Sequence, residues 1–344
     1  MEKWQEELTQ CLRSVEDLEH FLPLKNKTAI FEAISRARMS ITPHTASLID
    51  WQNPQDPLFL ISVPRENELN ISDKELDDPL GEKISSPIPF LTRKYSDRVI
   101  ITVSFVCPQY CRFCFRRDRT GCATEGPSVE DREQIRQYLI NNPEIKEVIL
   151  SGGEPLLLTD NQLSEWLKMI DDVGCRIRIH SRVPVTLPSR ITSELVKLLS
   201  DFKVTIITHF NHPKEIAPAN IEAIKRLVEA GLIVKNQSVL LRGVNSSTEV
   251  LSKLINRLVE LSVKQHAIHQ LDLAKGTNHF RVPLVEGIKI VRGLGELAPP
   301  YYLDMPDGRG KVNVLSSLKF VEGKNFVFDR NGELLEYSEV DVIL

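Results

Sequence analysis

The stretch "RVIITVSFV", residues 98–106, decides the fold. It is a continuous run of β-branched and apolar residues, a composition that suits a strand buried on both faces. Such strands are typical of parallel sheets, because helices cover both faces of these sheets. The stretch therefore predicts the first strand of a buried parallel sheet.

Strand-like and helix-like segments alternate after this strand. The hydrophobic pattern predicts strands over residues 146–151, 175–181, 203–208, 232–241, 266–274 and 300–305. It predicts helices over residues 128–142, 160–173, 191–200, 218–230, 248–262 and 283–297, the first of them opened by a capping box of Ser128 and Asp131. About six β-α units in succession indicate an α/β fold, a partial (β/α)6-type TIM barrel. A doubly wound sheet is the alternative.

Three regions divide the chain. Residues 1–96 combine helices with irregular connections rich in Pro and Asp, and residues 97–310 form the barrel core. Residues 311–344 form a short C-terminal segment with a β-hairpin, for which Asn331 and Gly332 are the expected two-residue loop.

The composition excludes several classes of partner. The chain has 344 residues, with 43 Lys and Arg against 47 Asp and Glu, so no strong field favours nucleic acid or an acidic membrane. The N-terminal stretch is too acidic for a targeting peptide, and no apolar run approaches the ~18 residues of a membrane span. We expect a cytoplasmic protein that binds neither nucleic acid nor membrane.

Half of the six cysteines are clustered directly after the first core strand. Cys107, Cys111 and Cys114 have the spacing C-x3-C-x2-C, whereas Cys11, Cys122 and Cys175 are isolated. Chemistry in α/β folds sits at this end of the strands. A structural zinc site would require a fourth ligand at regular spacing, whereas a [4Fe–4S] cluster held by three thiolates leaves one iron open. The cluster is favoured, with zinc and a chance grouping as alternatives.

Two motifs carry a resemblance to the radical S-adenosylmethionine (SAM) superfamily. Phe113 precedes the last cysteine, and the next strand ends in "SGGE", residues 151–154. The resemblance implies that SAM chelates the open iron and that Ser151, Gly152, Gly153 and Glu154 line its site, where two glycines let backbone groups reach the SAM ammonium. His180, Ser181, Arg182 and Gln237, near the ends of later strands, are expected in the same pocket.

A longer resemblance runs from about Pro43 to the C-terminal hairpin. Stretches such as "RKYSDRV" (93–99), "CRFCFRR" (111–117), "RIHSRVPVTLPSRI" (178–191), "NQSVLLRGVN" (236–245) and "LDMPDGRGK" (303–311) are similar to the lysine 2,3-aminomutase family, including its relatives that make β-lysine for elongation factor P. The resemblance implies an isomerase that combines SAM radical chemistry with pyridoxal 5′-phosphate (PLP). Such enzymes move an α-amino group to the β-carbon.

The resemblance also assigns the PLP site. Lys311 stands where the family forms its Schiff base, although by pattern alone it is a turn lysine, and Asp307 and Arg309 replace glycines of the lysine mutases. Lys94 and Arg98 match the pair that binds the PLP phosphate. Lys94 replaces an arginine, a loss for which the neighbouring Arg93 could compensate.

The substrate follows from three further positions. Arg116 matches the arginine that holds the substrate carboxylate, while Asp272 and Asp304 match the pair that binds the ε-ammonium of lysine. A glutamate side chain would be repelled by two buried carboxylates. The resemblance therefore predicts an L-lysine 2,3-aminomutase, in which Arg112 and Arg117 are structural.

Several alternatives remain open at this point. The chain could be a family aminomutase acting on another amino acid, a radical SAM enzyme without PLP, or an iron–sulfur protein that is not an enzyme. The expected partners are the amino acid substrate and an external one-electron reductant, and a homo-oligomer is compatible with the resemblance.

Overall fold

A nine-stranded sheet organises the chain in the computed structural model, which describes residues 2–121, 126–306, 308–321, 324–329 and 332–337. Its strands neighbour each other in chain order, so that seven parallel strands are flanked by one antiparallel strand at each edge. The strands are β1 (Leu91–Thr92), β2 (Arg98–Ser104), β3 (Glu147–Gly152), β4 (Arg176–His180), β5 (Thr205–Thr208), β6 (Ile233–Leu240), β7 (Lys264–Gln270), β8 (Tyr301–Met305) and β9 (Gly310–Asn313).

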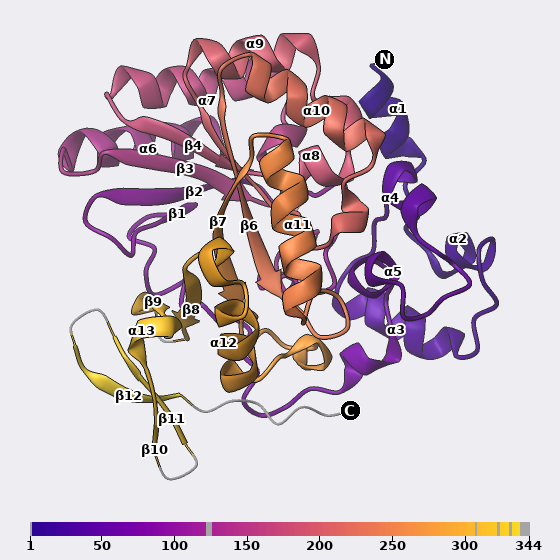
Figure 1. The fold of residues 1–344 in the computed structure, drawn as a ribbon. Helices are drawn as coiled ribbons and strands as arrows, with labels where there is room; N and C mark the ends of the chain where they lie inside the picture. Colours follow the sequence, from indigo (N-terminus) through magenta and orange to yellow (C-terminus); the bar gives the residue numbers. More distant parts are fainter. Residues whose placement is uncertain (1, 122–125, 307, 322–323, 330–331, 338–344) are drawn as a thin grey trace.

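Helices fill each connection between successive parallel strands and lie along the outer face of the curved sheet (Figure 1). They are α6 (Val129–Asn141), η2 (Pro155–Leu157), α7 (Asp160–Asp172), α8 (Val183–Thr186), η3 (Pro188–Arg190), α9 (Ser193–Asp201), η4 (Pro213–Glu215), α10 (Pro218–Glu229), α11 (Thr248–Glu260), η5 (Asn278–Phe280), α12 (Leu284–Arg292) and η6 (Gly295–Leu297). The predicted α/β fold with a partial barrel is confirmed.

The first core strand shows why the prediction succeeded. Val99, Ile101 and Val103 of β2 are buried in the main hydrophobic cluster, beneath the helices. Helix α6 begins at the predicted capping box, because the Ser128 hydroxyl accepts the Asp131 amide at 3.1 Å and the Asp131 carboxylate accepts the Ser128 amide at 2.9 Å. Strand and helix thus arise from local sequence signals that agree with the burial of the sheet.

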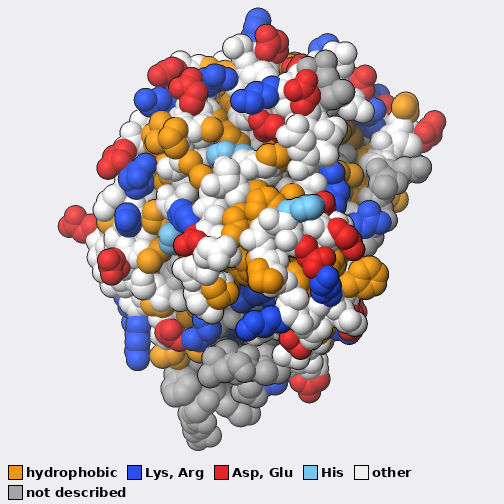
Figure 2. All heavy atoms as spheres, turned by 90° about the vertical axis from the view of Figure 1, so that its right-hand side faces the viewer, with side chains coloured by type: hydrophobic (Ala, Val, Ile, Leu, Met, Phe, Trp, Pro, Cys, Tyr) orange, Lys and Arg blue, Asp and Glu red, His pale blue; other side chains and the backbone are white. Residues whose placement is uncertain are grey.

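The N-terminal region packs against the loops at the C-terminal ends of the strands. Its elements are α1 (Lys3–Thr9), α2 (Val15–Glu19), α3 (Lys27–Arg36), α4 (Pro43–Leu48), α5 (Pro57–Ser62) and η1 (Glu66–Leu69), drawn in indigo and purple in Figure 1. The Thr42 hydroxyl donates to the Thr186 carbonyl at 2.5 Å, and the Ile61 carbonyl accepts the Arg112 amide at 3.0 Å. The region therefore supports the loop that carries the cysteines. On its outer face, charged side chains of both signs are interspersed (Figure 2).

The C-terminal region adds elements that the sequence did not predict. β9 pairs antiparallel with β8, and β10 (Leu318–Val321) joins β11 (Lys324–Phe328) and β12 (Leu334–Tyr337) in a separate three-stranded sheet after α13 (Val314–Ser317). The paired residues Phe328 and Leu334 leave residues 329–333 as the hairpin connection, longer than predicted, and Asn331 lies outside the described residues.

The main sheet extends across both predicted region boundaries. β1 precedes residue 97 and β9 spans residues 310 and 311. The strand predicted over residues 266–274 begins two residues earlier and ends at Gln270, because the chain leaves the sheet there and the Leu273 carbonyl accepts the Leu76 amide at 2.7 Å. Within the part of the chain that the structure describes, no helix is both long and apolar enough to cross a membrane.

Candidate active site

The three clustered cysteines lie in the loop that leaves β2, near enough for their thiols to interact electrostatically. Burial, followed by the Cys111 thiol, raises the pKa of Cys114 to about 11, and burial, followed by the Cys114 thiol, raises the pKa of Cys107. No three described His, Cys, Asp or Glu side chains are arranged to hold a single metal ion. In a [4Fe–4S] cluster each thiolate binds a different iron, so the sulfurs need not converge on one point. Three thiols in one loop are a ligand set that suits such a cluster.

Two glycines at the end of β3 let the chain lie directly on the cysteine loop. The Gly153 amide donates to the Ser104 carbonyl at 2.6 Å, and a Cβ at Gly153 would lie 2.5 Å from the Val106 carbonyl oxygen. A Cβ at Gly152, whose φ is +122°, would lie 2.4 Å from the Ser104 oxygen. The sequence predicts that these glycines make room for SAM. In the structure they also allow the ends of β2 and β3 to approach each other closely.

Glu154 and Ser181 are engaged by protein groups at the ends of β3 and β4. The Glu154 carboxylate accepts the Arg182 amide at 2.8 Å and the Leu156 amide at 3.2 Å, while burial raises its pKa to about 7. The buried Ser181 hydroxyl accepts the Val183 amide at 3.0 Å. These two predicted SAM residues hold the strand ends together.

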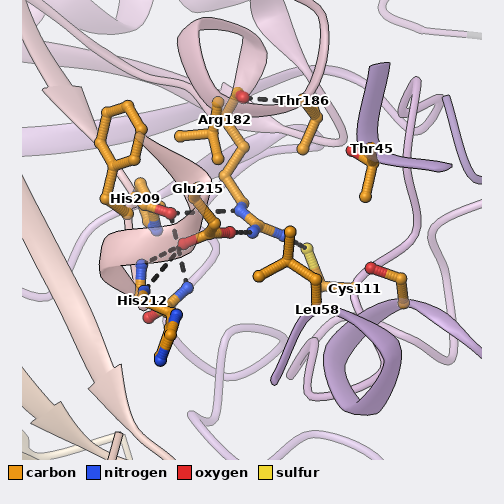
Figure 3. A network of polar contacts seen from close by, with 12 residues as sticks. Thr45, Leu58, Cys111, Arg182, Thr186, His209, His212 and Glu215 are labelled. Atoms are coloured by element: carbon orange, nitrogen blue, oxygen red, sulfur yellow. Dashed lines mark hydrogen bonds and ion pairs between the residues drawn. The ribbon is translucent and has the colours of Figure 1, made fainter. Parts of the chain in front are cut away.

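Arg182 and Gln237 also lie at this end of the sheet, each with a protein partner. Figure 3 shows the Arg182 guanidinium pointing at the Cys111 sulfur, with 2.6 Å from Nη1 to Sγ. The Gln237 amide nitrogen lies 2.8 Å from the His209 Nε2. The His180 Nε2 is buried and has no partner among the described residues. The structure thus places His180 and Arg182 at the carboxyl end of β4, and Gln237 within β6, one position beyond the last pair with β5.

The Arg116 guanidinium is buried and faces Glu82. Its Nε and Nη2 donate to the two Glu82 oxygens at 2.8 and 2.5 Å, and its Nη1 donates to the Ser151 hydroxyl at 3.1 Å and the Gly152 carbonyl at 3.2 Å. Burial would raise the pKa of Glu82, but the charges and hydrogen bonds of Arg116 and Arg119 together outweigh burial and hold this pKa at about 2. Arg116 is therefore a fixed cation at the junction of the cysteine loop and β3.

Arg112 and Arg117 share one buried carboxylate, that of Glu68. Arg112 donates to both Glu68 oxygens, at 2.9 and 2.6 Å, and Arg117 donates to one of them at 2.5 Å. Burial alone would raise the pKa of Glu68, but the two guanidinium groups lower it by more than burial raises it, to about 2. Both arginines thus anchor the cysteine loop to η1, as the sequence predicted.

Glu68→Gln should lower the free energy of unfolding by about 3–5 kcal/mol, because it leaves two buried guanidinium groups without a charged partner. The folded pKa of about 2 lies below the ordinary 4.5, so this stabilisation is present above pH 4.5 and is lost as the pH falls through 2. Urea denaturation at pH 7 measures the change. Glu133→Gln on the exposed face of α6 is the matched control and should leave the curve unchanged. Equal midpoints for wild type and Glu68→Gln would contradict the assignment.

Lys311 lies opposite Asp304 in the pairing of β8 and β9. The two residues are register partners, with 3.6 Å from the Lys311 Nζ to the Asp304 Oδ2. The Lys311 amide donates to the Tyr95 hydroxyl at 3.1 Å, and the Arg98 guanidinium carbon lies 5.0 Å from the centre of the Tyr95 ring. β9 therefore joins the predicted Schiff-base lysine to one of the aspartates and to the strand entry.

The two aspartates have opposite ionisation tendencies. Burial, followed by the Asp304 carboxylate, raises the pKa of Asp272 to about 7. Burial would raise the pKa of Asp304 as well, but Lys311 and His269 hold it below its ordinary value, and the His269 Nδ1 lies 3.7 Å from the Asp304 Oδ2. The pair thus offers one firmly ionised carboxylate beside one that titrates near neutral pH.

The basic residues before and at the start of β2 do not all face the same way. Lys94 donates to the Leu80 carbonyl and is buried enough that its pKa is lowered. Arg98 is partly exposed and pairs with Asp97 at 3.0 Å. Arg93 is directed to Glu144 at 2.5 Å and to residues of α6. Arg93 therefore cannot compensate for the replacement of an arginine by Lys94, and this suggestion from the sequence is wrong.

The sequence did not single out some residues that hold the site together. Glu82, Glu215 and Tyr95 position Arg116, Arg182 and Lys311, respectively. Tyr95 stands inside the quoted stretch "RKYSDRV", so its position between two predicted phosphate ligands was the available signal. Cys11 and Cys175 are buried at other places in the fold, and Cys122 and Asp307 lie outside the described residues.

Known proteins match this arrangement. The radical SAM superfamily profile matches residues 101–255. The chain is 37% identical over 348 residues to the L-lysine 2,3-aminomutase of Clostridium subterminale, an alignment that covers 98% of this chain and 84% of that protein. The chain belongs to the lysine 2,3-aminomutase family. The family enzyme of Methanococcus maripaludis is 39% identical over 352 residues, covering 98% of this chain and 81% of that protein.

Membership in the family establishes a radical SAM aminomutase, which is an isomerase. It also confirms the expectation of SAM and a [4Fe–4S] cluster. A glutamate 2,3-aminomutase of Clostridioides difficile is 36% identical over 343 residues, covering 96% of this chain and 80% of that protein. Among solved structures, a radical SAM methyltransferase from Sphaerobacter thermophilus superposes with a TM-score of 0.43 and 18% identity, covering 62% of this chain and 67% of that one. The lysine and glutamate relatives are about equally similar, so the substrate must be argued from individual residues.

Proposed function

We propose that the chain is a PLP-dependent L-lysine 2,3-aminomutase that converts lysine into β-lysine. The observation that carries the proposal is the pair of largely buried but accessible carboxylates, Asp272 and Asp304, near Lys311. Two carboxylates at the far end of a substrate site favour a cationic side chain, because an anionic one would lie unpaired against like charge. The glutamate relative has a substrate of the opposite side-chain charge.

Cys107, Cys111 and Cys114 would hold the cluster, and SAM would occupy the space among the carboxyl ends of β3 to β6. The bound cluster, when reduced, supplies the radical chemistry that begins with cleavage of SAM. The segment Ser151–Glu154, with Ser181 and Gln237, would line the SAM site as backbone and side-chain donors and acceptors. The buried His180 Nε2, which has no partner among the described residues, supports a polar ligand in this space.

The residues around Lys311 fit PLP. Its amine forms an ion pair with Asp304, and its strand is connected through Tyr95 to the segment of Lys94 and Arg98. Lys94 would contact the phosphate as a point charge and Arg98 as a guanidinium fork. When bound, PLP supplies the electron delocalisation that amino migration requires. The chain's own task is to hold the substrate in place and exclude water.

Substrate lysine would span two charged ends of the site. Arg116 would hold its α-carboxylate with the N–H of Nη2 that Glu82 leaves over, next to the cysteine loop. Asp272 and Asp304 would hold its ε-ammonium, once the Lys311 amine turns away from Asp304. We also propose that an external one-electron reductant supplies electrons to the enzyme. We propose that the enzyme works in the cytoplasm, where thiols stay reduced.

A comparison of amino acids tests the substrate. Anaerobically reconstituted protein is incubated with SAM, PLP, a reductant and, separately, lysine, glutamate or arginine, and the β-isomers are separated by chromatography. We expect β-lysine as the dominant product. Glutamate or arginine turning over faster than lysine would assign the enzyme to another substrate within the family.

The Asp272 carboxyl gives the substrate affinity a pH dependence. Below its pKa of about 7 it holds a proton and loses its attraction for the ε-ammonium, so the KM for lysine should rise about tenfold between pH 8 and pH 6. Asp272→Asn should raise KM and abolish the dependence. Initial rates at pH 6, 7 and 8 measure both effects. A wild-type KM that is constant over this range would rule out the ionised pair as the ammonium site.

A further inference from the structure

The Arg182 guanidinium is held at three points, one of which is a cluster cysteine. Its Nε donates to the His209 carbonyl at 3.2 Å, its Nη2 to the Glu215 Oε1 at 2.5 Å, and its Nη1 to the Cys111 Sγ at 2.6 Å (Figure 3). The guanidinium carbon also lies 5.7 Å from the centre of the Phe113 ring, one residue before Cys114. The guanidinium is thus fixed against the cysteine loop from the opposite side of the site.

The groups that hold Arg182 are themselves fixed. The Glu215 Oε2 accepts the Asn211 amide at 2.6 Å and the His212 amide at 3.0 Å, so the carboxylate is tied to the loop after β5. The Arg182 amide donates to the Glu154 carboxylate. Both the backbone and the side chain of Arg182 are thus anchored. The contact between its guanidinium and Cys111 is therefore fixed by the fold.

Cys111 differs from the other two cysteines of the loop in its hydrogen bonding. Among the described residues, Arg182 alone donates a cationic hydrogen bond to a cluster sulfur. Arg116, the other buried arginine nearby, directs its N–H groups to Glu82, Ser151 and Gly152 instead. The charge-assisted hydrogen bond is therefore a specific feature of one ligand position.

The surroundings of the loop make such a bond consequential. Phe113 packs in a buried apolar cluster with Leu60, Ile61, Leu241 and Phe280. An apolar environment opposes any added negative charge. Reduction of the cluster adds one electron from the external reductant, with no bond broken and no proton transferred, and so makes the thiolate-bound centre more negative by one charge.

We propose that Arg182 raises the reduction potential of the cluster by donating to the Cys111 sulfur. The inference rests on the proposed cluster ligands of the function above. A guanidinium on a ligand sulfur stabilises the reduced, more negative form more than the oxidised form, so the cluster accepts its electron at a higher potential. In this role Arg182 is a positioning and tuning residue for the cluster rather than a ligand of SAM.

The test compares three variants of the full chain in the absence of SAM. Arg182→Gln removes the charge, and Arg182→Lys keeps the charge without the three-point geometry. Arg178→Gln is the matched control, an arginine of β4, the strand that precedes Arg182, and it is paired with Glu147. Each reconstituted protein is assayed for iron and sulfide, and the reduced-cluster electron paramagnetic resonance signal is titrated against potential.

At a fixed potential we expect the reduced-to-oxidised ratio of Arg182→Gln to fall about tenfold, a shift of about 59 mV to lower potential. Arg182→Lys should lie between Arg182→Gln and wild type, and Arg178→Gln should match wild type. An unchanged midpoint in Arg182→Gln would overturn the proposal. So would loss of the cluster in both Arg182 variants, which would assign a structural role.

SAM binding separates this proposal from the original prediction for Arg182. If Arg182 held SAM, Arg182→Gln would weaken SAM binding and leave the SAM-free midpoint unchanged, and the tuning role would be excluded. The wild-type sample tests the proposed function independently, because a wild-type protein that binds no [4Fe–4S] cluster would refute the cluster ligands before any variant is compared.

Discussion

Cys114→Ser should give a folded protein that holds no intact [4Fe–4S] cluster and forms no β-amino acid. Three thiolates are the smallest set that holds the cluster while leaving one iron for SAM, so loss of one removes the source of the radical. Activity should fall by at least about 10³-fold. Iron and sulfide analysis, visible absorption and the product assay measure the two losses together.

The matched control is Cys175→Ser. Cys175 has the same thiol group but is buried directly before β4, at the amino end of that strand. There its thiol donates to the Ile145 carbonyl at 3.4 Å. This variant should keep its iron and most of its activity. Equal iron contents and activities in Cys114→Ser and wild type would contradict the assignment of the loop as the cluster site.

Lys311→Ala should abolish both PLP attachment and turnover. The lysine is held on β9 by pairing with Asp304 and by the Tyr95 hydroxyl, so no other amine is presented at that point by β8 and β9. Without the amine, PLP is not bound covalently and the substrate is not delivered in a fixed orientation. We expect loss of the enzyme-bound pyridoxal absorbance and a fall in activity of at least about 10³-fold.

Lys275→Ala is the control for Lys311→Ala. Lys275 is half-exposed and pairs with Asp77 at 2.8 Å, in the loop after β7. Its replacement should leave the pyridoxal absorbance and the rate unaffected. If Lys311→Ala retained both, the alternative of a radical SAM enzyme without PLP would be favoured.

The barrel core was predictable because its signals are local. The apolar run of β2 and the cap of α6 each report burial or helix initiation within a few residues, and the cysteine triplet follows β2 directly. Because carboxyl ends of parallel strands meet at one edge, polar residues after successive strands could be expected to converge. In the structure Ser151 lies near the end of β3 and Arg182 just after β4, whereas Gln237 lies within β6; their role at the SAM site stays a prediction.

Pairings between distant segments were not predictable. Arg116 meets Glu82 and Arg182 meets Glu215, partners 34 and 33 residues apart that no periodicity connects. β9 was also missed, because its Gly-rich start has the composition of a turn. Yet β9 alone places Lys311 opposite Asp304, and only the register of the strands reveals that contact.

The most direct test of the account is an isotope experiment on the reconstituted wild-type enzyme. Lysine labelled with ¹³C at C2 and C3 and with ¹⁵N at the α-amino group is supplied with SAM, PLP and reductant, and the ¹³C–¹⁵N couplings are followed by nuclear magnetic resonance. We expect that the coupling at C2 disappears and that the same nitrogen becomes coupled to C3 of the same molecule. Nitrogen that stays on C2, or that leaves the labelled molecule, would contradict an aminomutase acting on lysine.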